Sequence, residues 1–419
     1  YYVIDLKALD VKLNNGADYL NILAKGTKDI EKADNVRDVY IINEQSHTIY
    51  YPAGVEYGGR VNYRLPEVYT KMEDSELFPT IEELKGGSYV AKTTTAKDSN
   101  GNKIKIPQGF KVAADSGLNV TEGIVIEDSD IIDGIGNGRG NQYVWIPVEN
   151  GIKKNDGTTV NITLGRYSFA NGTSDKDTNE TVLEKGTPIL KQDAANYTQE
   201  VIINSYYKEL ATSRVGEVDS SNHLNDTNTT ALNLEGFVDS VKANGGYYIA
   251  RYEASYGTDG KANSKVSNTY ATSTPNKEGQ LWNYITQINA ATASRNLYNT
   301  VNSDLINSYA WDTAIVYIQN FSGDTEYSKQ KGYSISIKHA VANTGTNNDE
   351  KCKINDMASN TREWSTECCT QSWYGTAHPC TIRGGWYDDP FGLPSTDDRY
   401  NYNVTHSSGN ISFRCALYM

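Results

Sequence analysis

The chain has 419 residues, a formal net charge of −13 at pH 7 and a mean hydropathy of −0.59. This length exceeds that of one ordinary domain, so two or three domains are expected. The 52 acidic residues outnumber the 39 basic ones, which argues against nucleic acid as a partner because its phosphates require lysine and arginine. No apolar run approaches the length of a membrane span.

The aromatic composition is unusual, with 31 tyrosines against 7 phenylalanines. Tyrosine packs like phenylalanine but keeps a hydroxyl group for hydrogen bonding, which suits hydrated binding surfaces and exposed sheets. The alternative is a β-rich protein whose tyrosines are half-buried. The composition is compatible with both interpretations.

Three elements are predicted within the first sixty residues. Residues 1–6 alternate and are rich in β-forming side chains, which predicts a strand. Residues 16–25 have apolar side chains at helical spacing, which predicts a helix. Residues 39–43 and 48–51 are also β-forming and flank a polar stretch, which predicts a hairpin.

The Tyr-Tyr-x-Ile-Asp start and the hairpin resemble the globular part of type IV pilin-like proteins of Gram-positive bacteria. The resemblance covers residues 1–70 and implies a small pilin-like α/β region. It also implies pilus or filament subunits as partners. Contact with a membrane would be made only through a preceding N-terminal helix, which this sequence does not contain.

Residues 71–137 are punctuated by glutamate, proline and glycine and predict a linker with short β-strands. Within it, residues 98–102 predict the turn between two strands. A glycine-rich loop at 134–140 precedes a β-forming segment. It therefore does not match the dinucleotide-binding pattern, in which the glycines lie between a strand and a helix.

Residues 138–419 are predicted to form a single C-terminal domain. Residues 143–148 are strongly β-forming and aromatic, and residues 245–253 predict a core strand. Residues 282–298 and 309–319 carry apolar side chains at helical spacing, which predicts two helices.

Three segments near the C-terminus resemble the signature of the formylglycine-generating enzyme (sulfatase-modifying factor) family. They are residues 355–364, residues 381–386 with an Arg-Gly-Gly motif, and residues 411–419 with a Phe-Arg-Cys motif. The strand at 245–253 is similar to an early core strand of that family. The resemblance implies an α+β fold, in which a C-type lectin-like C-terminal domain follows the pilin-like region.

The same resemblance implies a structural calcium site. The family's asparagine and glutamate correspond to Asn360 and Glu363, and Asp356 adds a carboxylate nearby. Oxygen ligands of this kind suit calcium. Two family positions differ, with Ser359 for glycine and Arg362 for tryptophan. The alternative is that Glu363 only accepts backbone hydrogen bonds.

The catalytic residues of the family are not found. The family enzyme binds copper(I) through two cysteines between the Arg-Gly-Gly and Phe-Arg-Cys motifs, and thiolates are the ligands that copper(I) requires. Here the interval from Trp386 to Phe413 contains no cysteine. The histidines are scattered and form no H-x-x-x-H set. The sequence therefore predicts a protein that is not an enzyme and requires no cofactor, and a metal-dependent oxidoreductase is the alternative.

The cysteines gather at one end of the chain. Their clustering in a polar region predicts disulfides and an extracellular or cell-surface location. None has the spacing of a zinc site. The five are Cys352, Cys368, Cys369, Cys380 and Cys415.

The interval that lacks the copper ligands is dense in Tyr, Asp, Asn and Ser instead. These residues dominate antibody-like contact surfaces, and the segment resembles the variable region of proteins diversified by retroelements. The alternative is an ordinary polar loop with packed tyrosines. The predicted ligand-binding residues are Trp386, Tyr387, Asp388, Asp389, Asp398, Tyr400, Asn401 and Tyr402.

Together these patterns predict a surface-displayed protein on a pilin-like stalk that binds a protein or carbohydrate ligand without catalysis. A structural filament subunit is a further alternative.

Overall fold

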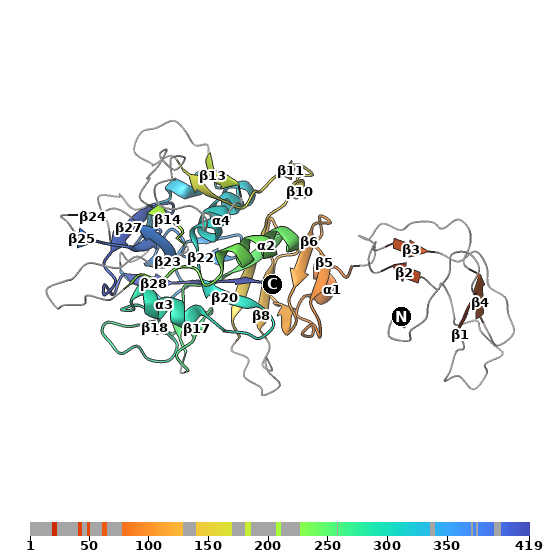
Figure 1. Cartoon of the computed structure of the whole chain (residues 1–419), viewed down its shortest axis with the longest axis horizontal. Coiled ribbons are helices and arrows are strands. Elements are labelled where there is room, and N and C mark those ends of the chain that lie inside the picture. The colour runs from red at the N-terminus through yellow and green to blue at the C-terminus, as the bar shows by residue number, and fades with distance from the viewer. Residues whose placement is uncertain are drawn as a thin grey trace. The chain divides into compact units, whose positions relative to one another are not determined.

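The computed structural model divides the chain into two units, Tyr1–Phe78 and Pro79–Met419. In the first unit it describes four short strands and Phe78; in the second it describes most residues (Figure 1). The described ranges are 19–22, 41–43, 48–50, 61–64, 78–128, 140–169, 181–185, 207–210, 227–257, 259–335, 340–369, 372–373, 376–388 and 395–419.

The first unit confirms one prediction and contradicts another. Strands β2 (Ile41–Asn43) and β3 (Thr48–Tyr50) pair antiparallel, as the predicted hairpin requires. The helix predicted over 16–25 is wrong where it is described, because β1 (Tyr19–Ile22) pairs with β4 (Val61–Arg64). Four residues cannot distinguish helical from strand periodicity, and pairing with a distant strand decides between them. The predicted strand at 1–6 lies outside the described residues.

The second unit contains a six-stranded sheet in the order β20-β29-β15-β9-β8-β7. Strand β29 reaches the end of the chain and lies between β20 and β15. Nearly every residue of β9 and β15 is buried, so both faces of the sheet are covered there. The bounds are β7 (Phe110–Val112), β8 (Val125–Asp128), β9 (Gln142–Pro147), β15 (Gly246–Ala250), β20 (Asn302–Leu305) and β29 (Cys415–Tyr418).

The predicted boundary at residue 137 differs from the structure. Strand β8 lies in the predicted linker, yet it pairs with β9 of the C-terminal domain. Strands β5 (Thr94–Lys97) and β6 (Lys103–Ile106) form the expected hairpin. Its turn is held by Asp98, whose Oδ1 accepts the Asn102 backbone N–H at 2.7 Å. The described residues from 79 to 128 therefore fold with the C-terminal domain.

A second sheet has five strands. Its order is β14-β23-β26-β27, and β28 pairs parallel with β23. Strand β26 therefore lies between β23 and β27. Strand β27 carries the predicted ligand-binding residues Tyr400, Asn401 and Tyr402. The bounds are β14 (Tyr207–Lys208), β23 (Arg362–Cys369), β26 (Cys380–Arg383), β27 (Arg399–Tyr402) and β28 (Ile411–Phe413).

Helix α4 (Ser308–Phe321) confirms the helix predicted over 309–319. It begins where the Asn307 side chain accepts the Ala310 N–H at 2.9 Å. All but one of its residues are buried, and it contacts both β9 and β23, so it packs against both sheets (Figure 1). A helix buried on every side belongs to the core.

The remaining elements are short. Helix α3 (Gln287–Ser294) occupies only the middle of the predicted 282–298 helix. No helix among the described residues is long and apolar enough to cross a membrane. The others are α1 (Ile81–Leu84), α2 (Leu234–Asn244), α5 (Gly332–Ile335), the 3-10 helix η6 (Tyr327–Lys329), β10 (Ile152–Lys153), β11 (Thr159–Val160), β12 (Gly165–Ser168), β13 (Thr181–Lys185), β16 (Ser255–Tyr256), β17 (Ala262–Asn263), β18 (Thr269–Tyr270), β19 (Gln280–Leu281), β21 (Glu350–Lys351), β22 (Ile354–Asn355), β24 (Ser372–Trp373) and β25 (Thr376–Ala377).

Candidate ligand-binding face

A buried network of charged side chains holds β27 in place. The Asp312 carboxylate of α4 forms ion pairs with the Arg383 guanidinium at 2.6 Å and the Arg399 guanidinium at 2.5 Å. Glu367 of β23 accepts Arg166 at 2.6 Å and Arg399 at 3.0 Å. Burial raises the pKa of Glu367, but the three guanidinium groups outweigh it and bring that pKa down to about 2. The Glu367 carboxylate is therefore charged at neutral pH, and Arg399 ties β27 to α4 and β23.

The pleat of β27 decides which predicted ligand residues reach the surface. Tyr400 is 50% exposed, and Tyr402 lies on the same side of the strand because alternate residues share a face. Asn401 points to the other side, is 5% exposed, and accepts the Tyr207 hydroxyl at 3.0 Å. The structure therefore does not bring Asn401 onto the face with the two tyrosines.

The exposed side of β27 carries an aromatic patch, formed by Tyr400, Tyr402 and His406. The two tyrosine rings lie edge to face at 5.2 Å, and His406 stacks on Tyr402 at 3.6 Å with an interplanar angle of 3°. Burial and the nearby His378 lower the pKa of His406. A neutral imidazole stacked on a phenol gives the patch a flat, well-defined surface.

Charged groups border the aromatic patch. The Arg362 guanidinium lies 5.4 Å from the centre of the Tyr400 ring and 3.1 Å from the Asp398 carboxylate. The half-buried Asp398 therefore lies beside the patch, and its role in ligand binding stays a prediction. His406 and Arg362 were not predicted as site residues, because the stacking that places them is visible only in the folded chain.

The other predicted ligand residues that the structure describes are Trp386, Tyr387 and Asp388. The Trp386 and Tyr387 rings lie 5.9 Å apart and are half-buried, and Asp388 is exposed. The Tyr387 N–H donates to the Asn360 carbonyl at 3.2 Å. Asp389 lies outside the described residues.

The predicted calcium ligands bond to protein groups. Glu363 accepts Arg414 Nε at 2.7 Å, and Asp356 accepts the Gly345 N–H at 2.5 Å. Asn360 Oδ1 accepts the Ala342 N–H at 2.8 Å. Among the described residues, no three His, Cys, Asp or Glu side chains are arranged to hold a metal ion. The calcium role of these residues stays a prediction.

Asp356 and Asn360 are both in the left-handed backbone region, with φ of 62°. Asp and Asn enter this region more readily than other residues that carry a side chain. These two residues therefore allow the backbone to turn between 356 and 360.

Burial raises the pKa of several thiols. Cys352, Cys380 and Cys415 are buried thiols, so the disulfides predicted from their clustering are not found for these three. Burial raises the pKa of Cys352 and of Cys415 to about 12. Such thiols stay protonated at neutral pH, whereas copper(I) requires thiolate.

Thiol titration with Ellman's reagent tests this arrangement. We expect almost no reaction of the folded chain and reaction of at least Cys352, Cys380 and Cys415 after unfolding in denaturant without reductant. Burial blocks the reagent, and the raised pKa values suppress the reactive thiolate. Fewer than three reactive thiols in the unfolded chain would mean that at least one of these three cysteines is in a disulfide, contrary to the structure.

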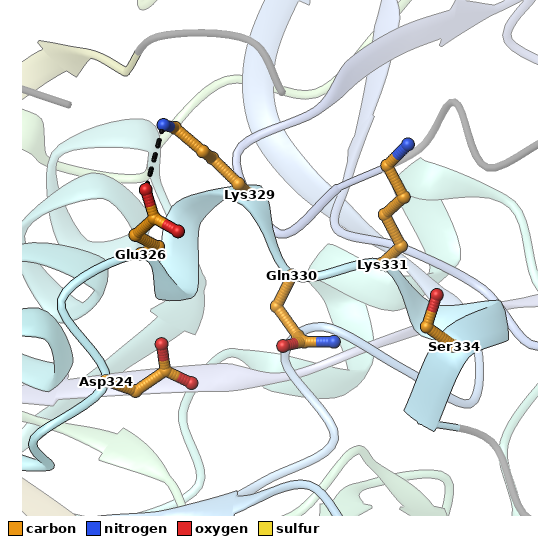
Figure 2. Close-up of a pocket in the computed structure, with 6 residues that line it drawn as sticks. All are labelled: Asp324, Glu326, Lys329, Gln330, Lys331 and Ser334. Atoms are coloured by element: carbon orange, nitrogen blue, oxygen red, sulfur yellow. Dashed lines mark hydrogen bonds and ion pairs between the residues drawn. The ribbon is translucent and has the colours of Figure 1, made fainter. Parts of the chain in front are cut away.

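A polar pocket lies between η6 and α5, with a volume of about 270 Å³ (Figure 2). Its acidic groups are paired, because Lys329 contacts Glu326 at 3.3 Å and Lys351 contacts Asp324 at 3.1 Å. None of the predicted ligand residues lines it. The pocket wall touches the segment before β27 through the Thr396 N–H, which donates to the Gln330 carbonyl at 3.0 Å.

No protein-family model matches the chain, and no curated protein matches it. Among solved structures, CarF is 14% identical with a TM-score of 0.29, covering 42% of this chain and 87% of its own. Treponema denticola variable protein 1 is 12% identical with a TM-score of 0.28, and the match covers 51% of this chain and 94% of that protein. The Major Tropism Determinant P3c variant is 12% identical with a TM-score of 0.30, and the match covers 90% of this chain and 94% of that protein. Similarities this low assign neither a family nor a function.

Proposed function

We propose that this chain is a non-enzymatic ligand-binding protein whose contact face is built on the aromatic patch. The arrangement of β27 carries the proposal. One side of the strand presents Tyr400 and Tyr402, while Arg399 on the other side is fixed by two buried carboxylates. Aromatic side chains held by a rigid framework bind with little loss of conformational entropy.

The residues around the patch supply polar contacts. Asp388 is exposed and Asp398 is half-buried, and both belong to the predicted interval. Trp386 and Tyr387 add half-buried aromatic area. Side chains of this mixed type are enriched at protein interfaces, with aromatic residues as the main contributors of binding energy.

The domain is displayed at the cell surface and diversified by a retroelement in this proposal. The C-terminal motifs support a variant of the C-type lectin fold displayed at the cell surface, and the Tyr- and Asp-rich interval supports diversification by a retroelement. A reverse transcriptase gene beside this one, with a near-copy of the segment encoding residues 384–415, would support diversification. The absence of both from the locus would contradict it.

The oxidoreductase alternative has less support. The interval between the family motifs contains no cysteine, and the described thiols of Cys352, Cys380 and Cys415 are buried. Loading with copper(I), followed by metal analysis and an oxygen-consumption assay, separates the two functions. Stoichiometric copper bound through thiolate would overturn the ligand-binding proposal.

Replacing Tyr400 and Tyr402 together with alanine tests the contact face. We expect binding to arrayed peptides, proteins and glycans to be lost, because the variant removes the two aromatic side chains on the exposed side of β27. The melting temperature should fall only moderately, since Tyr400 is 50% exposed, Tyr402 is half-buried against the core, and the strand is held from its other side.

Tyr89→Ala is the matched control for this variant. Tyr89 is a half-buried tyrosine outside the face, with Lys111 4.9 Å from its ring centre, and its loss should leave binding unchanged. A large fall in melting temperature for the Tyr400/Tyr402 variant would show that these rings are part of the core. Unchanged binding would show that the ligand contacts another surface.

A further inference from the structure

An aromatic residue outside the predicted interval has a strained backbone next to the face. Tyr284 has a φ of 52°, in the left-handed region that bulky side chains rarely enter. Its N–H donates to the Ser408 carbonyl at 2.9 Å, and its hydroxyl donates to the Thr272 carbonyl at 3.1 Å. Backbone strain of this kind persists only where the surroundings enforce it, and it concentrates at functional sites.

The contact between Tyr284 and the 408–409 segment is close. Asn283 Nδ2 donates to the Gly409 carbonyl at 2.8 Å. A Cβ atom at Gly409 would lie 2.6 Å from the Tyr284 hydroxyl, so a larger residue there would displace the Tyr284 ring. The 283–284 segment is therefore fixed against the loop that follows His406 of the aromatic patch.

A second exposed tyrosine belongs to the same region. Tyr270 on β18 is 37% exposed, and it lies two residues before Thr272, the acceptor of the Tyr284 hydroxyl. Strand β18 pairs with β19, which ends shortly before Tyr284. Tyr270 and Tyr284 are therefore held together by backbone pairing and by a side-chain hydrogen bond.

A chain of hydrogen bonds joins this region to Tyr387. The carbonyl of Asn268 accepts Asn343 Nδ2 at 3.1 Å, and the neighbouring Ala342 N–H donates to Asn360. Asn360 in turn accepts the Tyr387 N–H. Burial raises the pKa of Tyr387, and Asp388 and the hydroxyls of Tyr284 and Tyr270 raise it further, which agrees with this proximity.

We propose that Tyr270, Tyr284 and Tyr387 form a tyrosine group that extends the ligand-binding face beyond residues 386–410. We further propose that the face binds a protein surface bearing exposed arginine side chains. This proposal rests on the proposed function of the aromatic patch. It adds contact residues from the 268–284 segment, which lies more than one hundred positions before the predicted interval.

The chemistry of the face favours arginine. Guanidinium groups stack on tyrosine rings, and Arg362 already does so on Tyr400 at 5.4 Å. The exposed Asp388 adds a carboxylate for bidentate pairing. The formal charge of −13 favours approach of a basic partner.

A protein surface is favoured over a small carbohydrate because of shape. Tyr270 and Tyr400 project from strands with large exposed fractions, 37% and 50%. The pocket in Figure 2 is lined by none of the tyrosines. Small-ligand sites are concave, whereas protein interfaces use exposed aromatic anchors across a broad face.

The test uses the full chain and three fluorescein-labelled peptides with alternating Gly-Arg, Gly-Lys or Gly-Glu sequences. Fluorescence anisotropy should show binding of the arginine peptide, weaker binding of the lysine peptide and none of the glutamate peptide. High ionic strength should weaken the binding. Failure of the unsubstituted chain to bind the arginine peptide would overturn the proposed partner, as would binding of arrayed glycans through the same tyrosines.

The variants separate this inference from the proposed function. Tyr270→Ala should weaken arginine-peptide binding by roughly fivefold, since a cation–π contact contributes about 1 kcal/mol. Tyr270→Phe should retain binding, and the control Tyr89→Ala should bind like the unsubstituted chain. If Tyr400→Ala loses binding while Tyr270→Ala does not, the face ends at the predicted interval. If neither variant changes binding, the proposed function itself fails.

Discussion

Replacing Glu367 with glutamine is expected to lower the free energy of unfolding at pH 7 by about 3–5 kcal/mol. The substitution keeps the shape of the side chain but removes a buried negative charge that faces Arg166, Arg383 and Arg399. Guanidinium groups cannot shed their protons to adapt, so their buried charges would lose compensation. Urea unfolding followed by circular dichroism measures the change.

The same variant should also lose ligand binding, because Arg399 holds β27 through Glu367 and Asp312. Glu326→Gln is the matched control. Glu326 is 63% exposed and forms a 3.3 Å ion pair with Lys329, so its substitution should change stability by at most about 0.5 kcal/mol. A similarly small effect of Glu367→Gln would contradict the proposed importance of the buried network.

The second large effect is a loss of stability as the pH rises from about 4 to about 7. Burial raises the pKa of Glu209 and of Asp397 to about 7. Above their ordinary pKa values the unfolded chain releases these protons while the folded chain retains them, so unfolding becomes progressively easier. Because one pKa unit corresponds to about 1.4 kcal/mol, the two raised pKa values predict a total loss of several kcal/mol, which levels off above pH 7.

The contribution of Glu367 to stability depends on pH in the opposite direction. Its pKa of about 2 lies below the ordinary value, so its contribution is present above pH 4.5 and is lost as the pH falls towards 2. Maximum stability is therefore expected between about pH 4 and 5. Thermal melts across the pH range measure the profile. The Glu209→Gln and Asp397→Asn variants should flatten the fall between pH 4 and 7, and stability that increases over this range would contradict the assignment.

Some of the site could be predicted because it depends on local pattern alone. The alternation of exposed and buried residues on a strand placed Tyr400 and Tyr402 together once β27 was formed. The same alternation turns Asn401 inward. Composition indicated a candidate interval but could not assign its residues to a face, because the ends and register of β27 depend on pairing with β26.

Other parts of the site could not be predicted because they join distant segments. Hydrogen bonds between the segments at 268–284, 342–343 and 360 link Tyr270 and Tyr284 to the region of Tyr387. Nothing near them in the sequence signals this contact. Glu363 was predicted as a calcium ligand from a family motif, and the structure places Arg414 against it.

The sequence by itself determined the β-forming aromatic runs of β9 and β15, the helical spacing of α4 and the hairpin turn at Asp98. β-Branched and aromatic residues favour strands, and apolar side chains at helical spacing favour a helix. The tertiary structure alone decided the strand at residues 19–22, the inclusion of β8 in the C-terminal domain, and the composition of the face. Each of these depends on pairing or packing with residues far away in the chain, and local propensity is too weak to overcome such contacts.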